Sequence, residues 1–179
     1  MSASSKTPRR IMALWFPRLP TDRLQRREQA QQSSALEAPP LVLVTKVNNA
    51  LRLSAVDRRA TLQGLTIGQP LANARAMLPT LKVVAANEPA DLKLLTGIAD
   101  WCDRFTPFVA LDGPRRLLLD VTGVAHLFGG EQAMLDRIRE NLQAQGFALR
   151  SALAGTAAAA RALARYRDGA VVASGEEGQ

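Results

Sequence analysis

Cysteine and histidine are almost absent from this chain of 179 residues, which contains one of each. The single cysteine, Cys102, excludes an intramolecular disulfide and a thiolate metal cluster. Because Cys102 stands beside Trp101 in an apolar stretch, we expect it to fill the core. His126 has no second histidine, cysteine pair or acid cluster near it, so we predict a packed or surface side chain. The composition therefore gives no reason to expect a metal ion or another cofactor.

Long hydrophobic runs are missing as well. Residues 11–16 form an apolar run, but Pro17 ends it before it reaches the length of a signal-peptide core or a membrane span. We therefore expect a soluble, cytoplasmic protein without membrane contact. Apolar residues still make up 47% of the chain and charged residues 22%, which supports a buried core with room for a smaller inserted lobe.

Negative charge is in short supply. The formal net charge is +7, and arginine provides nearly all of the positive side chains. This balance favours a polyanionic partner, because each phosphate that a protein neutralises releases counterions on binding. The alternative is a general preference for arginine over lysine, with the charge merely solvated.

Apolar periodicity and turn residues predict an α+β chain. The predicted strands are 11–16, 41–45, 51–55, 81–85, 109–112, 117–120, 147–153 and 171–173, and the predicted helices are 21–32, 56–63, 70–78, 88–104, 131–145 and 156–166. Asn48 and Asn49 are expected to turn a hairpin between the second and third strands. The first strand and the second half together read strand, helix, strand, strand, helix, strand, which is the split βαβ order of a ferredoxin-like sheet.

Three segments resemble one protein family. Residues 110–113, followed by Leu-Leu-Leu-Asp-Val-Thr-Gly-Val-Ala-His-Leu-Phe-Gly-Gly-Glu at 117–131, are similar to a segment shared by ImuB proteins. Residues 64–79 resemble the fingers segment of that family, and residues 152–164 resemble its last palm strand and helix. The resemblance runs from about Arg9 to the C-terminus. It implies the palm and fingers of a Y-family translesion DNA polymerase and, for ImuB proteins, a catalytically deficient subunit of a bacterial mutagenic complex.

The resemblance also implies how the chain is divided. The fold expected is a ferredoxin-like split βαβ palm with a small fingers lobe inserted after its first strand. Because the chain ends about where a thumb would begin, it is expected to lack the thumb, the little finger and a clamp-binding peptide. The expected parts are a disordered N-terminus at 1–8, a palm at 9–16 and 82–173, fingers at 17–81 and a tail at 174–179.

The catalytic acids of the active polymerases would fall on four positions. Nucleotidyl transfer needs two Mg²⁺ ions held by carboxylates from neighbouring strands. The Asp-x-Asp of the active enzymes falls on Trp15 and Pro17, and their Asp-Glu pair falls on Asp112 and Gly113. One remaining carboxylate cannot hold two magnesium ions against their hydration. We therefore expect a degenerate site without catalytic residues or metal.

The phosphate-gripping residues of the family are changed too. Its Tyr-x-x-Arg-x-x-Gly falls on residues 58–64, where only Gly64 remains in register, and its Asn-Lys pair becomes Thr156-Ala157. Arginines near these places are candidates for nucleic-acid contact, although solvated charge is an equally ordinary role for them. The candidates are Arg58, Arg59, Arg115, Arg116, Arg161 and Arg165.

Ordinary structural roles compete at several of these positions. An aspartate before Gly113-Pro114 is normal turn chemistry, so the local sequence favours a turn role for Asp112 over a relic metal ligand. Trp15 would be a core residue in most proteins. Asp120 and Thr122 are expected to cap the segment that starts at Val124.

The leading hypothesis is a non-catalytic, Y-family polymerase-like subunit in DNA damage tolerance and SOS mutagenesis, which acts by binding or bridging. The resemblance implies weak contact with DNA. It also implies a RecA-like accessory protein, an error-prone replicative-type polymerase subunit and the sliding clamp as partners, mostly through regions after the palm. Two alternatives stay open: a residual nucleotidyltransferase that uses Asp112 with an acid such as Asp120, and a protein-binding module without DNA contact.

Overall fold

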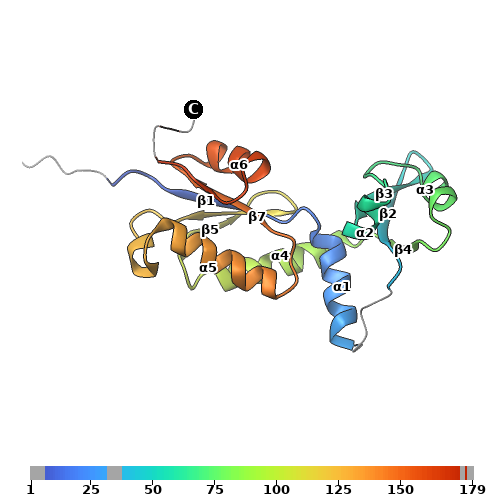
Figure 1. The fold of residues 1–179 in the computed structure, drawn as a ribbon, viewed down its shortest axis with the longest axis horizontal. Helices are drawn as coiled ribbons and strands as arrows, with labels where there is room; N and C mark the ends of the chain where they lie inside the picture. The colour runs from blue at the N-terminus through green and yellow to red at the C-terminus, as the bar shows by residue number, and fades with distance from the viewer. Residues whose placement is uncertain (1–6, 32–37, 174–175, 177–179) are drawn as a thin grey trace, which may run out of the picture. The chain divides into compact units, whose positions relative to one another are not determined.

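The computed structural model describes residues 7–31, 38–173 and 176. The chain forms two compact units, Met1–Pro17 with Leu92–Gln179 (unit 1) and Arg18–Asp91 (unit 2), and each contains its own β-sheet (Figure 1). Of the expected disordered N-terminus only Thr7 and Pro8 are described, and of the expected tail only Glu176. The remainder of both segments lies outside the described residues.

Unit 1 is built on a five-stranded sheet in the order β5-β6-β1-β7-β8. Strand β1 pairs antiparallel with both β6 and β7, and β5 pairs antiparallel with β6. The predicted ferredoxin-like order is therefore confirmed, with β8 added in parallel at one edge. The strands are β1 (Ile11–Trp15), β5 (Val109–Leu111), β6 (Arg116–Asp120), β7 (Arg150–Ala154) and β8 (Ala170–Val171).

Helices cover both faces of this sheet. Helix α6 (Ala157–Tyr166) lies on one face, and α5 (Glu131–Ala144) and α4 (Glu88–Cys102) lie on the other (Figure 1). Alternation along β1 explains the two faces: Ile11 and Ala13 pack against alanines of α6, and the intervening Met12 and Leu14 are buried on the opposite side. A short 3-10 helix, η1 (Ala125–Phe128), precedes α5.

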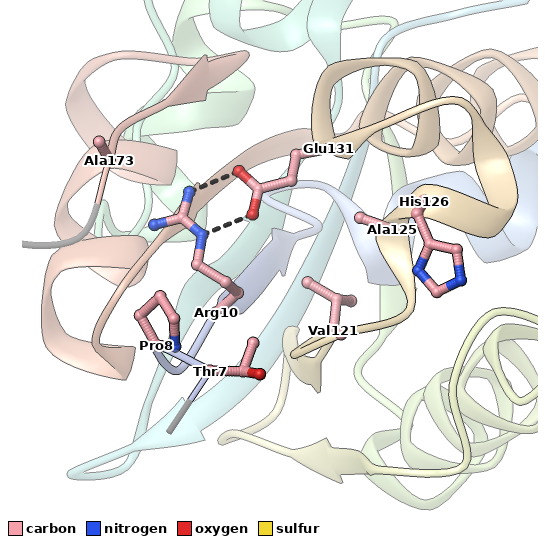
Figure 2. A pocket seen from close by; sticks show the side chains of 9 residues that line it. Thr7, Pro8, Arg10, Val121, Ala125, His126, Glu131 and Ala173 are labelled. Atoms are coloured by element: carbon pink, nitrogen blue, oxygen red, sulfur yellow. Dashed lines mark hydrogen bonds and ion pairs between the residues drawn. The ribbon is translucent and has the colours of Figure 1, made fainter. Parts of the chain in front are cut away.

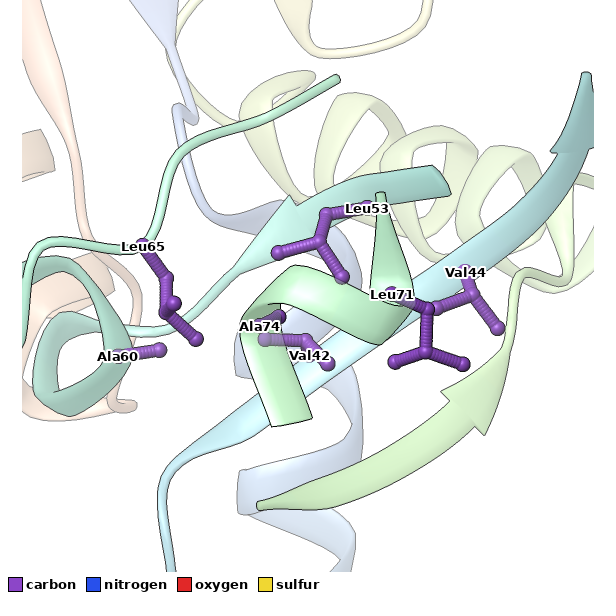
Figure 3. Packing of buried hydrophobic residues seen from close by; sticks show 7 residues of the cluster. All are labelled: Val42, Val44, Leu53, Ala60, Leu65, Leu71 and Ala74. Atoms are coloured by element: carbon purple, nitrogen blue, oxygen red, sulfur yellow. The ribbon is translucent and has the colours of Figure 1, made fainter. Parts of the chain in front are cut away.

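Unit 2 contains a three-stranded sheet in the order β3-β2-β4. Its hairpin turns at Asn48 and Asn49, whose φ values of 47° and 61° fit the predicted two-residue turn. One face of the sheet carries a buried apolar cluster that includes Val42, Leu53 and Leu71 (Figure 3). The elements are α1 (Leu19–Gln31), β2 (Leu41–Val47), β3 (Ala50–Val56), α2 (Arg58–Leu62), α3 (Leu71–Met77) and β4 (Lys82–Ala85).

The boundary between the units differs from the one expected at residue 82. Strand β4 pairs in parallel with β2, and its register runs from Leu41 opposite Lys82 to Val44 opposite Ala85. It therefore belongs to the sheet of unit 2, and the division falls between Asp91 and Leu92. The apolar pattern of β4 predicts a strand, but such a pattern does not say which sheet the strand joins.

In the part of the chain that the structure describes, no helix combines the length and the apolar character that crossing a membrane requires.

The expected core position of Cys102 is confirmed, because its side chain is fully buried. Burial raises the pKa of the Cys102 thiol to about 12, and the neighbouring carboxylate of Asp103 adds to the shift. We predict that the native chain reacts with Ellman's reagent more than 100-fold more slowly than the chain in 6 M guanidinium chloride, since only the thiolate reacts. Comparable rates under both conditions would contradict the buried position.

Candidate functional site

The C-terminal end of β1 brings together several of the positions that the sequence singled out. Trp15 is the last residue of the strand and pairs with Arg116 on β6 and with Arg150 on β7. Because Ile11 and Ala13 face α6, alternation places Trp15 on the same side of the sheet. Trp15 is half-buried there, and it is the middle residue of the row Arg116, Trp15 and Arg150 on three neighbouring strands.

Two guanidinium groups lie against the indole of Trp15. Cζ of Arg150 is 5.8 Å from the ring centroid, and Cζ of Arg165, on α6, is 5.9 Å from it. The negative face of an indole ring attracts a cation at such distances. Trp15 is therefore not a plain core residue, because it positions two arginines from neighbouring elements.

Asp112, in the turn between β5 and β6, is held by arginines from two sides. Arg161 on α6 donates two hydrogen bonds to it, from Nε to Oδ2 at 2.8 Å and from Nη2 to Oδ1 at 2.9 Å. Nε of Arg116 lies 3.0 Å from Oδ2. The hydrogen bond from Arg161 is the main reason why the pKa of Asp112 is lowered, and the charge of Arg116 adds to it against the opposing effect of burial. The same bond raises the pKa of Arg161.

The predicted turn role of Asp112 is also present. Its amide donates to the carbonyl of Arg116 at 2.9 Å, which closes the hairpin. Gly113 has a φ of 71°, a conformation that favours glycine. The local sequence thus predicts the turn, whereas the pair with Arg161, 49 residues away, depends on the packing of α6 against the sheet.

The main-chain carbonyl of Pro17 is engaged by an arginine. It accepts a hydrogen bond from Nη1 of Arg115 at 3.2 Å. The carbonyl of Arg115 in turn accepts from the amide of Phe16 at 2.8 Å. Arg115, a predicted nucleic-acid contact, therefore fastens the segment after β1 to the β5–β6 hairpin.

The residues present do not fit a pair of magnesium ions. Magnesium binds through oxygen ligands in near-octahedral geometry, and here one carboxylate is shared by two guanidinium groups. Asp120 cannot join Asp112, because it pairs with Ile11 at the other end of β6, about 13 Å away at about 3.3 Å per residue. Among residues 7–31, 38–173 and 176, no group of three or more histidine, cysteine, aspartate or glutamate side chains is placed to hold a metal ion.

The remaining predicted positions belong to other elements. Arg58 and Arg59 are exposed on α2 of unit 2, where Nη1 of Arg59 donates to the carbonyl of Ala38. Thr156 caps α6, as its side chain accepts from the amide of Ala159 at 3.2 Å. A helix cap therefore stands at the place of the family's asparagine.

The capping role expected of Asp120 and Thr122 is wrong. Helix η1 begins after Val124 without a side-chain cap. Oδ1 of Asp120 instead accepts from the amide and the hydroxyl of Thr122 at 3.1 and 2.6 Å. The hydroxyl oxygen of Thr122 in turn accepts from the amide of Arg10, so both side chains tie the strand end together.

Sequence reasoning missed Arg150. It carries no motif and stands two residues before the start of an alanine-rich run, so only its register opposite Trp15 reveals its place. The resemblance at 152–164 identifies the last palm strand. Pairing that strand with β1 and counting back along it would have placed Arg150 opposite Trp15.

A cavity of about 410 Å³ lies beyond the other end of β1 (Figure 2). Its wall includes Arg10, whose Nε and Nη2 each lie 2.6 Å from an oxygen of Glu131 at the start of α5. The third nitrogen, Nη1, is enclosed by protein atoms and has no partner among the described residues. A ligand could reach it only by displacing those atoms, so we assign the cavity no role. His126 lies on its wall and is exposed, which fits the surface alternative of the two predicted for it.

Comparison with known proteins places this geometry in a family. The profile of the impB/mucB/samB family matches residues 24–165. The chain belongs to the impB/mucB/samB family. Protein ImuB of Caulobacter vibrioides, strain NA1000 / CB15N, is 45% identical to it over 115 residues, which cover 64% of this chain and 25% of that protein. The predicted resemblance to ImuB proteins is thereby confirmed.

Solved structures show the same fold for this member of the impB/mucB/samB family. A binary complex of Dbh DNA polymerase matches with a TM-score of 0.74 at 14% identity, over 92% of this chain and 48% of that one. DinB from Sulfolobus solfataricus matches with a TM-score of 0.69 at 15% identity, over 94% and 49%. The chain thus spans about a quarter of the length of the curated relative and about half of the solved chains. The palm and fingers architecture predicted from the sequence is confirmed.

The ion pairs of Asp112 predict a pH-dependent stability in this impB/mucB/samB chain. A carboxylate with a lowered pKa stabilises the folded state above its unfolded pKa of about 3.9, and the contribution is lost as the pH falls through the lowered value. We expect Asp112→Asn to lower the free energy of unfolding by about 1 kcal/mol at pH 7. The difference from the wild type should shrink below about pH 4. Urea unfolding at pH 7 and pH 3 measures both values.

The control is Asp100→Asn, which changes an exposed aspartate on α4. It should leave the unfolding midpoint unchanged at both pH values. A loss of stability in Asp112→Asn that stays equal from pH 7 to pH 3 would show that the charge of Asp112 is not responsible.

Proposed function

We propose that this chain is a non-catalytic, polymerase-like subunit in DNA damage tolerance, which acts by binding or bridging rather than by joining nucleotides. Membership of the impB/mucB/samB family and the similarity to ImuB support the role in damage tolerance. The observation that carries the non-catalytic part is the state of Asp112. It is the single acid left at the expected catalytic positions, and two arginines bind it.

A metal ion would have to replace both arginines at Asp112. Displacing Arg161 gives up a bidentate pair of charge-assisted hydrogen bonds. Trp15 and Gly113 supply no oxygen ligands from their side chains, so the ion would gain only one carboxylate in return. The balance favours the arginine pairs over a magnesium site.

The alternative of a residual nucleotidyltransferase loses its geometric support. It required a second acid near Asp112, and Asp120 lies at the far end of β6, where it is engaged by Arg9 at 3.1 Å and by Thr122. A purely protein-binding module remains a different outcome of the experiments below.

The partners we propose follow from the family rather than from a contact in this chain. They are DNA, a RecA-like accessory protein, an error-prone replicative-type polymerase subunit and the sliding clamp, within an SOS response in the cytoplasm. The chain spans a quarter of the curated relative, and we propose that most of these contacts are made by regions after the palm.

We expect no primer extension by this chain with Mg²⁺ or with Mn²⁺. A labelled primer-template, all four deoxynucleotides and denaturing gel electrophoresis provide the measurement, with an active Y-family polymerase as the positive control. Asp112→Ala should leave the gel pattern unchanged. Incorporation by the wild type that Asp112→Ala abolishes would overturn the proposal.

A further inference from the structure

We propose that the end of β1 is a phosphate-binding site that works without a divalent metal ion and takes the phosphate groups of a nucleic-acid strand. The site, called here the Trp15 cluster, consists of Trp15, Asp112, Arg116, Arg150, Arg161 and Arg165. This inference rests on the proposed function, because it names a ligand for a palm that lacks the catalytic carboxylates.

The charges of the Trp15 cluster are unbalanced in favour of an anion. The cluster contains four guanidinium groups and one carboxylate, and that carboxylate is engaged by Arg116 and Arg161. Arg150 and Arg165 have no carboxylate partner within the part of the chain that the structure describes. Asp112 therefore repels an incoming phosphate only weakly, and two cations are left to attract it.

The arginines are positioned before any ligand arrives. Arg116 and Arg150 are fixed by strand register on either side of Trp15, and the indole attracts both Arg150 and Arg165. Holding long side chains in place reduces the conformational entropy that binding would otherwise cost. The side chains of Arg116 and Arg161 keep 39% of their surface exposed, so they remain reachable while they bind Asp112.

Guanidinium chemistry and spacing favour a chain of phosphates. The planar fork of arginine matches phosphate oxygens, which it often binds through two hydrogen bonds. Arg116 and Arg150 lie two strands apart, which corresponds to about 10 Å across a sheet. The cations are spread along this span, which suits the repeated charges of a nucleic-acid strand, and one small anion held between converging side chains is the other outcome of the experiment.

The effect of Mg²⁺ on binding distinguishes the Trp15 cluster from a nucleotide site that requires a metal ion. Because guanidinium groups contact the phosphate directly, Mg²⁺ would compete with them for the phosphate oxygens. We therefore expect Mg²⁺ to weaken binding to the Trp15 cluster. A site that used Asp112 as a metal ligand would respond in the opposite direction.

The experiment measures fluorescence anisotropy of a labelled 15-nucleotide oligothymidylate with the 179-residue chain in EDTA, over a salt series. We expect the double variant Arg150→Gln/Arg165→Gln to bind about tenfold more weakly at 50 mM salt. The slope of log affinity against log salt should become shallower by about 1.4, because each lost phosphate contact on a single strand contributes about 0.7. Adding 5 mM Mg²⁺ should weaken wild-type binding.

Two further variants control this measurement. Arg104→Gln removes one positive charge elsewhere in unit 1, where Arg104 lies 4.8 Å from the ring of Trp101, and it should leave the salt slope unchanged. Arg150→Lys/Arg165→Lys keeps both charges and should retain the slope, which separates loss of charge from damage to the fold. Urea midpoints equal to that of the wild type identify the variants that can be compared.

Deoxyadenosine triphosphate in EDTA, used as a competitor, identifies the source of the phosphate. Displacement of the oligonucleotide by micromolar triphosphate would support the site but assign it to nucleotides, and failure to displace it would support the strand. The proposal is overturned if Arg150→Gln/Arg165→Gln binds like the wild type, if binding requires Mg²⁺, or if the folded chain does not bind the oligonucleotide. Primer extension is measured separately, so each of these results leaves the test of the proposed function intact.

Discussion

The pair between Asp112 and Arg161 joins two parts of unit 1 that are far apart in the sequence. Asp112 stands in the β5–β6 turn and Arg161 on α6, and two hydrogen bonds of 2.8 and 2.9 Å connect them. Helix α6 rests on β1 and β7 through small residues such as Ala160 and Ala164. Because this packing brings the helix close to the sheet, Arg161 can reach across to the hairpin. The charge at the end of β1 depends on that contact.

Much of the fold could be predicted from the sequence because it is encoded locally. The strand and helix patterns around β1 and in the second half give the ferredoxin-like order, and Asn48-Asn49 gives the hairpin of unit 2. The sequence pattern does not predict the unit to which β4 belongs, because its partner β2 lies about forty residues earlier and an apolar run does not specify which strand it pairs with. Long-range pairing is information that a single sequence does not display.

The sequence predicts that the catalytic carboxylates are missing from the candidate site, but it does not predict the arginine contacts that the structure shows there. Trp15, Pro17 and Gly113 can be read as missing acids once the family pattern is aligned to them. That Arg150 faces Trp15, and that Arg161 binds Asp112, follows only from strand register and helix packing. Asp120 and Thr122 show the same limit, since both suit a helix cap by residue type but bind each other instead.

The left-handed backbone conformation of Gly113 affects whether a carboxylate could be regained at this position. A β-carbon at Gly113 would lie 4.0 Å from Nη2 of Arg116, on a backbone with a φ of 71° that disfavours any side chain. A carboxylate regained there by one substitution would need a strained backbone and would lie beside the guanidinium of Arg116, which would compete with a metal ion for it. That substitution alone would not restore a metal site, because Trp15 and Pro17 also stand at positions expected to carry carboxylates.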